Sequence, residues 1–399
     1  MAKSFVLGAV GDIEFDRSCG ESIARHGPLW PFDKMLPRLR QADLLIGNME
    51  SIILPDDYPE ELRDPSGLVG RVDGTPGLKA AGFDLMVLAN NHVLDGGHVS
   101  MFHTQRLIER LGIATVGVGR TQAEARRMRV LKCQSLRVGF LAYCEDTNYS
   151  LGTPGPCHAY YTLGTVLEDI ARNRSAVDVL VVNIHADLEF MQTPSMPRRE
   201  NARAIARAGA DLVLMHHPHV PQGIEMIDGR LIAYSLGNFY FGAHSMAYMR
   251  ENGPHTGHSF LLLAEVSKQG VLGFSRVPFE IAKPPNERPV PLKGPARAAL
   301  LKYLRRLDAL AQDDAVVAAN WRATALKTLD IYLDRIMGGK YSRQELLEDV
   351  LGRLMLVPEN RIWVEEALRS VGQQWRQRAD QVDPYHRPLF NFAYLRKKK

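Results

Sequence analysis

Residues 84–97, DLMVLANNHVLDGG, join a short apolar run to a polar loop. The apolar run 85–89 has the length and composition of a buried strand, and the Asn-Asn and Gly-Gly pairs mark where it breaks. The loop carries Asn91, His92 and Asp95. Open α/β sheets place their ligand sites at the carboxyl ends of the strands. The stretch therefore predicts a strand that delivers amide, imidazole and carboxylate groups to one edge of a sheet.

Four other predicted strands end in the same kind of residue. They are 4–10 followed by Asp12, 43–47 followed by Glu50, 177–184 followed by His185 and Glu189, and 211–215 followed by His217 and His219. Taken singly, an Asp after a Gly is usually a turn residue, and a histidine at a strand end is usually a surface or satisfied core residue. Five strands that all end this way at one edge are much harder to explain by accident, so we expect a functional site there.

Histidine nitrogen and carboxylate oxygen are the ligands that zinc, manganese and iron take from proteins. Two such ions about 3.5 to 4 Å apart need a bridging carboxylate and separate ligands for each ion. The strand ends supply enough of both, so we expect divalent metal ions, two of them, with Mn, Fe or Zn all compatible. A purely structural metal is the alternative, but structural zinc sites are closed and usually contain cysteine.

Length and composition bound the other possibilities. The chain has 399 residues, of which 45% are hydrophobic and 24% charged, so it can bury a full core in two or three domains. Its net charge is only +4, and part of that lies in the terminal run 396–399. It has no stripe of basic and aromatic residues, which argues against a nucleic-acid partner.

The sequence also predicts a cytoplasmic protein. Residues 1–3 pass straight into the first predicted strand without a leader, and no window approaches the roughly 18 consecutive apolar residues of a membrane span. The four cysteines contain no CxxC pair, which fits reduced thiols in that compartment.

A composition shift divides the chain. Five prolines interrupt the pattern over residues 282–295, so we expect an α/β domain over 1–285 and a helical C-terminal extension over 286–399. The extension has helical periodicity over 297–311, 315–337, 342–357 and 358–375. It carries no catalytic constellation, and a lid, a docking surface and a homodimer interface all remain open.

The ordered motifs resemble a known family. They are Gly11-Asp12 with Arg17, Asn48-Met49-Glu50, the 90–96 segment NNHVLDG, HADLE at 185–189, HPHVPQ at 217–222 and YSLGNF at 234–239. This set, within residues 5 to about 242, resembles the capsule-biosynthesis CapA family, also called the poly-γ-glutamate synthesis (PgsA) family. That family is similar to the calcineurin-like metallophosphoesterases. The resemblance implies a four-layer fold, a β-sandwich of two sheets flanked by helices.

The resemblance also implies roles for individual residues. Asp12 matches the first metal ligand, Glu50 the bridging carboxylate, Asn91 a ligand of the second ion, and His185, His217 and His219 the metal-binding histidines. His92 matches the histidine that stabilises charge or protonates the leaving group, and Arg17 could pair with a carboxylate or phosphate of the substrate. Asp95 and Glu189 lie in the same motifs and complete the expected catalytic set.

Two motifs depart from the family pattern. Phosphoesterases begin Asp-x-His, whereas this chain has Glu14 in the third position, so Glu14 either replaces the missing ligand or points away. Where the family usually has HWGxEY, residues 185–190 read HADLEF.

Two functions follow from these observations. The first is a cytoplasmic metal-dependent hydrolase that cleaves an amide, peptide (for example γ-glutamyl) or phosphoester bond in a small-molecule or peptide-like anionic substrate. The second is a non-catalytic accessory protein of poly-γ-glutamate or capsule biosynthesis, which binds an anionic polymer or a partner synthase through the same cleft.

Overall fold

The computed structural model describes residues 4–63, 67–145, 155, 157–253, 255–338, 342 and 358–379. The contacts within the chain divide it into two compact units, Met1–Ala318 and Ala319–Lys399. The first unit contains all the strands that the structure describes, together with every residue of the predicted site.

The first sheet combines parallel and antiparallel strands. Its parallel part is formed by β1 (Ser4–Ile13), β2 (Leu44–Met49), β3 (Leu85–Val87) and β4 (Ala114–Val116). On the other side of β1 follow the antiparallel strands β14 (His258–Ser267), β15 (Gly270–Ile281) and β16 (Pro289–Pro291). The short strand β13 (Asn238–Tyr240) pairs in parallel with the end of β1.

The second sheet has six strands in the order β11, β12, β10, β9, β7, β6. Their bounds are β6 (Arg129–Cys133), β7 (Leu136–Cys144), β9 (Val179–His185), β10 (Leu212–His216), β11 (Ile224–Ile227) and β12 (Arg230–Ala233). Its centre is parallel, and every residue of β9 is buried, as expected for a strand covered on both faces. A separate two-stranded sheet pairs β5 (Val118–Gly119) with β8 (Cys157–His158).

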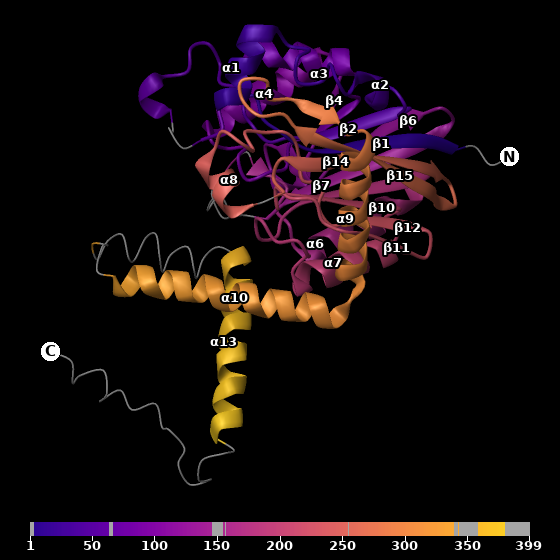
Figure 1. Ribbon diagram of the computed structural model, residues 1–399. Helices are drawn as coiled ribbons and strands as arrows, with labels where there is room; N and C mark the ends of the chain where they lie inside the picture. Colours follow the sequence, from indigo (N-terminus) through magenta and orange to yellow (C-terminus); the bar gives the residue numbers. More distant parts are fainter. Residues whose placement is uncertain are drawn as a thin grey trace. The chain divides into compact units, whose positions relative to one another are not determined.

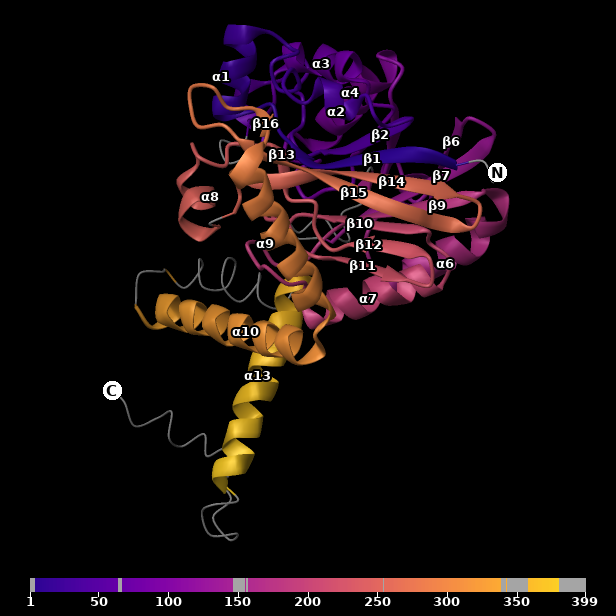
Figure 2. The ribbon, with the colours of Figure 1, turned by 45° about the vertical axis from the view of Figure 1, so that its right-hand side comes forward.

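The two sheets pack face to face with helices on both outer faces (Figures 1 and 2). One apolar cluster joins residues of both sheets and is the core between them. A second cluster joins the outer face of the first sheet to α1 (Arg17–His26), α2 (Leu36–Leu39), α3 (Thr75–Ala81) and α4 (Gly97–Arg110). A third joins the second sheet to α5 (Gln122–Ala125), α6 (Leu163–Asn173) and α7 (Met196–Arg207). These clusters confirm the predicted four-layer α/β fold.

Helix α9 (Gly294–Gln312) belongs to the first unit. Its buried residues Leu300, Leu304 and Leu307 lie in the core between the sheets, and Figure 2 shows the helix beside β15 and β11, which it contacts. The division by contacts therefore falls after Ala318, later than the composition shift at 282–295 indicates. Helix α10 (Asp314–Met337) begins in the first unit and continues into the second.

The second unit is helical where the structure describes it. It contains most of α10 and the whole of α13 (Pro358–Ala379), and the rings of Tyr332 and Trp363 lie 5.4 Å apart between these two helices. These helices confirm the helical C-terminal extension. The helix predicted over 342–357 lies outside the described residues except for its first residue.

Most predicted elements are confirmed, with local differences. The predicted strand over 113–119 divides into β4 and β5 because Gly117 has φ +101°, a conformation that glycine favours. The loop over 54–74 contains two short 3₁₀ helices, η1 (Glu60–Leu62) and η2 (Val72–Gly74). A third, η3 (Arg174–Ala176), follows α6, and α8 (Ala247–Asn252) follows β13. Among the described helices, none is long and apolar enough to cross a membrane.

Candidate metal centre

The carboxyl ends of four central strands bring the site together. In the first sheet, Asp12 on β1 pairs in register with Asn48 on β2, and Glu50 follows directly. In the second sheet, His185 on β9 pairs in register with His216 on β10. The site therefore forms where the ends of both sheets meet, at the edge that the sequence predicts.

Three overlapping groups of side chains offer ligand atoms within 4.8 Å of one another. They are Glu50 with His185 and His217, Asp12 with Glu50 and His219, and Glu189 with His217 and His219. Glu50 belongs to two groups, as a carboxylate shared by two ions would. All these residues except Glu189 are buried. Carboxylate oxygen and imidazole nitrogen in this arrangement suit zinc, manganese or iron.

Glu50 provides the test of whether a cation fits. Glu50 is 1% exposed, and neither of its carboxyl oxygens has a hydrogen-bond partner among the described residues. Burial, together with the charges of Asp12, Glu14 and Glu189, raises the pKa of Glu50 well above its usual range. A buried carboxylate without a partner is costly, and a bound cation relieves that cost. Oε1 lies 3.8 Å from His185 Nε2 and 3.7 Å from His219 Nε2, so the donor set fits a metal ion.

The histidines are held in the form that binds metal. Burial, followed by the neighbouring imidazoles, lowers the pKa of His185 well below its usual range. Burial likewise lowers the pKa of His217 to about 4. Both rings are therefore neutral near pH 7, and a neutral imidazole keeps a lone pair for a metal ion.

The pKa of Asp12 is lowered, in contrast to that of Glu50. Burial raises the pKa of Asp12, but His216, His219 and Asn48 outweigh that effect, so the net shift is downward. Its Oδ1 accepts a hydrogen bond from Asn48 Nδ2 at 2.8 Å and lies 3.3 Å from His216 Nδ1. Asp12 is therefore held as an anion, which is the form that coordinates a metal.

Neighbouring amides orient the expected ligands. Asn91 Oδ1 lies 2.8 Å from His185 Nε2, which places the two expected ligand atoms side by side. Asn238 Oδ1 lies 2.9 Å from His219 Nδ1 and leaves Nε2 directed at Glu50 and Glu189. The contact of Asn238 with His219 Nδ1, the nitrogen turned away from the carboxylates, is of the kind that fixes ring orientation and tautomer in metal sites.

The backbone is strained at the same place. Non-glycine residues have φ +97° at His217, +56° at His219, +94° at Asp187 and +64° at Phe190. Such conformations are costly for side-chain-bearing residues and gather at functional sites, where the surrounding structure enforces them. Two of these residues, His217 and His219, are expected metal ligands, and both belong to the ligand groups.

His92 and Asp95 form a pair beside the ligand groups. His92 Nδ1 lies 2.7 Å from Asp95 Oδ2, and the same oxygen accepts a hydrogen bond from the backbone N–H of Leu68 at 2.7 Å. The two side chains are 23% and 11% exposed, so His92 remains accessible to a ligand. Asp95 thus orients the imidazole of His92.

The remaining predicted residues take different positions. Glu189 lies in a ligand group, and its Oε2 accepts a hydrogen bond from Tyr248 Oη on α8. Arg17 is 40% exposed, donates to Met246 Sδ at 2.7 Å, and lies 3.6 Å from Asp16. Glu14 belongs to none of the three ligand groups found in the described residues. Its Oε1 accepts from Gly242 N at 2.6 Å, and burial raises its pKa to about 8.

The structure adds Asn48, His216 and Asn238 to the site, three residues that the sequence does not single out. Each directly adjoins a predicted ligand in the chain or lies in a quoted motif. Their apposition across the ends of the sheets is what the sequence alone does not show.

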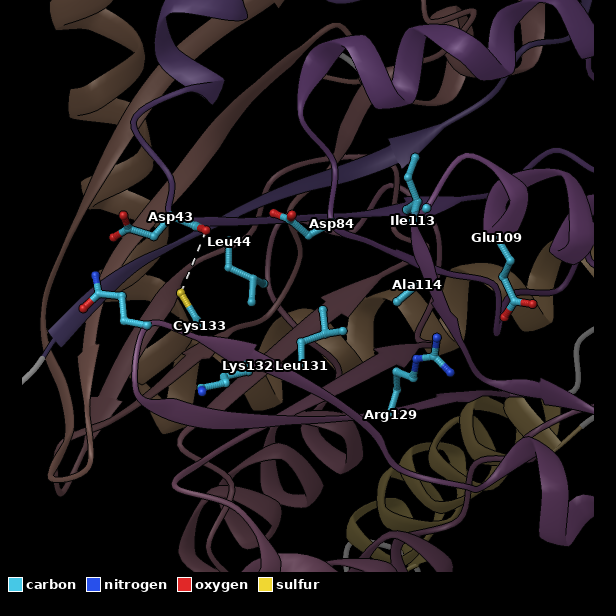
Figure 3. Close-up of a pocket in the computed structure, with 12 residues that line it drawn as sticks. Asp43, Leu44, Asp84, Glu109, Ile113, Ala114, Arg129, Leu131, Lys132 and Cys133 are labelled. Carbon is cyan, nitrogen blue, oxygen red and sulfur yellow. Dashed lines mark hydrogen bonds between the residues drawn. The ribbon is translucent and has the colours of Figure 1, made fainter.

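A cavity of about 490 Å³ opens at the amino ends of β2 and β3, away from the ligand groups (Figure 3). Two of its acidic residues complete the first sheet, since Asp43 Oδ2 accepts from Val6 N and Asp84 Oδ2 accepts from Leu45 N, each at 2.8 Å. Figure 3 also shows Cys133, whose Sγ donates to the Asp43 carbonyl. These carboxylates therefore serve the sheet rather than a second metal centre.

Comparison with known proteins gives the family. A family model described as "Bacterial capsule synthesis protein PGA_cap" matches residues 6–243. The capsule biosynthesis protein CapA of Bacillus anthracis is 28% identical over 247 residues, which cover 60% of this chain and 60% of that protein. The PGA biosynthesis protein CapA of Bacillus subtilis is 27% identical over 289 residues, with 71% and 73% covered.

Among solved structures, a phosphatase from Mycoplasma pneumoniae aligns with 72% of this chain and 97% of its own, at 14% identity and a TM-score of 0.46. The family model covers more than half of the chain and contains every residue of the candidate centre. The chain therefore belongs to the bacterial capsule synthesis protein PGA_cap family.

Proposed function

We propose that the chain is a metal-dependent hydrolase whose centre holds two divalent ions, Mn, Fe or Zn. The observation that carries this proposal is the carboxyl group of Glu50, which is buried without a hydrogen-bond partner in the described structure and shared by two groups of candidate ligands. Asp12, Glu50 and His219 would hold one ion, and Glu50, His185, His217 and Asn91 the other. Glu189 is available to either through its position beside His217 and His219.

When bound, such ions supply Lewis acidity and lower the pKa of a coordinated water toward 7. The chain's own residues supply the rest of the chemistry. Neutral His185 and His217 keep their lone pairs available, and the strained backbone at His217 and His219 fixes where those rings point.

His92 is the proposed proton donor to the leaving group. Its Nδ1 is held by Asp95, so Nε2 is the nitrogen directed away from that pair and available to a substrate. In its protonated form, His92 donates from Nε2 as the bond breaks, and Asp95 stabilises the positive charge on the ring.

The bond cleaved is an amide or peptide bond, with γ-glutamyl as one form, or a phosphoester bond. An anionic substrate fits because Arg17 at the start of α1 offers a guanidinium that is 40% exposed. A bidentate contact with a carboxylate or phosphate is the use to which such a group is suited.

A substrate screen tests the hydrolase. The full chain, loaded in turn with Mn, Fe or Zn, is incubated with p-nitrophenyl phosphate, bis-p-nitrophenyl phosphate and γ-glutamyl-p-nitroanilide. We expect metal-dependent turnover of one class, and His92→Ala to lower kcat by about 10²- to 10⁴-fold. His103→Ala, on α4, is the matched control. Absence of turnover with every metal, or a His92→Ala variant as active as the parent, would contradict the proposal.

An accessory role is the second candidate. Both relatives from Bacillus are named for biosynthesis rather than for hydrolysis, which favours a protein that binds an anionic polymer or a partner synthase. Under this proposal, His92→Ala leaves polymer binding unchanged. Sedimentation measures poly-γ-glutamate binding by the full chain and by the variant, and the substrate screen measures turnover. A hydrolase loses turnover but keeps binding in the variant, whereas an accessory protein binds the polymer in both forms and shows no turnover in either.

The location and the oligomeric state are part of the proposal as well. We place the protein in the cytoplasm, which cell fractionation checks. We also propose a homodimer through the helical extension, and light scattering of the full chain measures its mass.

A further inference from the structure

Tyr248 lies on α8, in the segment 241–253 that follows β13. Three contacts tie this segment to residues 14–18, just beyond the end of β1: Gly242 with Glu14, Ser245 with Ser18, and Met246 with Arg17. Figures 1 and 2 show α8 at the end of β1 that lies opposite the N-terminus, which is the end that carries Asp12. Helix α8 is therefore held beside the candidate metal centre.

The hydroxyl group of Tyr248 contacts a candidate ligand. Tyr248 Oη donates a hydrogen bond to Glu189 Oε2. The other carboxylate oxygen, Glu189 Oε1, lies 3.8 Å from His219 Nε2, and Glu189 shares a ligand group with His217 and His219. Tyr248 thus binds one oxygen of Glu189 while the other oxygen faces a candidate ligand.

Glu189 depends on such a contact more than the other acidic ligands do. Its side chain is 25% exposed, whereas those of Asp12 and Glu50 are fully buried. A glutamate in contact with solvent samples several rotamers, and fixing it in one of them costs conformational entropy. A hydrogen bond that holds the carboxylate before an ion binds reduces that cost.

The ring of Tyr248 is placed by a separate contact. It packs edge-on against the ring of Phe190, the residue next to Glu189, with ring centroids 5.2 Å apart. The ring of Phe190 in turn lies 6.3 Å from that of His219. Because this packing does not involve the hydroxyl group, Tyr248→Phe removes the hydrogen bond to Glu189 and keeps the ring contact.

We propose that Tyr248 is a positioning residue of the metal centre, whose hydroxyl group holds Glu189 so that Oε1 completes the ligand group with His217 and His219. This role rests on the proposed function, because it makes Glu189 a ligand of one of the two proposed ions. Removing a partner that orients a metal ligand typically lowers metal affinity or activity about 10- to 100-fold. Loss of the Tyr248 hydroxyl should therefore weaken the binding of one ion.

Isothermal titration with Mn²⁺, and separately with Zn²⁺, tests this role on the full chain after treatment with EDTA and dialysis. The test variant is Tyr248→Phe. The matched control is Tyr143→Phe, which removes a hydroxyl group that donates to Asp169 Oδ2 at 2.8 Å, a carboxylate on α6 outside the ligand groups. Glu189→Gln, alone and combined with Tyr248→Phe, shows whether Tyr248 acts through Glu189. Thermal unfolding of each metal-free protein detects a variant that merely loosens the fold.

We expect the parent to bind two ions, and Tyr248→Phe to bind one of them about 10- to 100-fold more weakly and the other within about threefold of the parent. The metal-free Tm of Tyr248→Phe should equal that of the parent. Tyr143→Phe should keep both affinities, and Tyr248→Phe should cause no further loss in the Glu189→Gln background.

Three results would overturn the role of Tyr248 and leave the metal centre in place. They are equal affinities in the parent and in Tyr248→Phe, equal weakening of both ions, and a further loss of affinity when Tyr248→Phe is added to Glu189→Gln. A parent that binds neither Mn²⁺ nor Zn²⁺ would instead contradict the proposed function, and the role of Tyr248 with it.

Discussion

Asp95 shows how one carboxylate can serve both the loop and the chemistry. A single oxygen of Asp95 accepts from Leu68 N and lies 2.7 Å from His92 Nδ1, so it ties the 67–70 segment to the proposed proton donor. Asparagine at this position keeps an acceptor for one group but cannot support a positively charged ring.

We therefore predict that Asp95→Asn lowers kcat about 10- to 100-fold and leaves KM nearly unchanged. The double variant with His92→Ala should be no slower than His92→Ala alone, because Asp95 acts through that ring. Steady-state kinetics on the four proteins measures this. Additive losses in the double variant would show that Asp95 acts on its own.

Asp178 links the two sheets at the end that lies opposite the ligand groups. Its Oδ2 accepts from Arg137 N at 2.8 Å at the start of β7, and its Oδ1 lies 3.0 Å from Lys268 Nζ at the turn between β14 and β15. The hydrogen bond from Arg137 N, followed by the contact with Lys268, lowers the pKa of Asp178.

A lowered pKa means that Asp178 stabilises the fold in its ionised form. This stabilisation is present above the unfolded pKa of about 3.9 and is lost as the pH falls through the lower, folded value. Asp178→Asn should therefore cost about 0.5 to 1 kcal/mol near pH 7 and nothing at the lowest pH, the amount being small because solvent is near. Urea unfolding of both proteins at several pH values checks this. A difference that does not shrink below pH 3.9 would contradict it.

A sequence singles out a candidate site residue most clearly where that residue directly follows a predicted strand. The sequence places Asp12, Glu50, His185, His217 and His219 at one edge of the fold because each follows an apolar strand whose end is unambiguous. The structure brings their side chains together there. His216 directly precedes His217, but a sequence does not show that its ring faces Asp12. The sequence leaves the role of Glu14 open for the same reason, and the structure shows its carboxylate accepting a hydrogen bond from Gly242 N.

For helix α9, the sequence predicts the element but not what it packs against. The spacing of Leu300, Leu304 and Leu307 indicates an apolar face but not the surface that this face covers. The structure shows it closing the core between the two sheets, which is why the first unit extends to Ala318. A proline-rich segment thus marks a bend in the chain rather than the end of the core.

We predict that Leu304→Ala, at a fully buried position, lowers the free energy of unfolding of the first unit by about 2 to 5 kcal/mol. Arg305→Ala, on the exposed side of the same helix, should change it by less than about 0.5 kcal/mol. Denaturant unfolding followed by the sheet signal in circular dichroism measures both. Equal stability of the two variants would mean that α9 is dispensable to the core.

Across the molecule, the sequence predicts the layers of the fold more fully than the arrangement of side chains in the site. Alternating strands and helices, together with the family motifs, predict the four layers, and the structure confirms them. The meeting of two sheets at one edge is a tertiary fact, so the shared position of Glu50 between two ligand groups could only be expected from the resemblance. The metal centre depends on that meeting, because the buried carboxylate of Glu50 has no hydrogen-bond partner among the residues that the structure describes.

The most direct test is the metal content of the full chain, purified without chelator and without affinity-column metal, by inductively coupled plasma mass spectrometry. We predict about two equivalents of Mn, Fe or Zn per chain, lost in the variant His217→Ala with His219→Ala and retained in His103→Ala. Circular dichroism confirms that each variant is folded. Less than about a tenth of an equivalent after reloading with each metal, or a double variant that retains its metal, would contradict the metal centre.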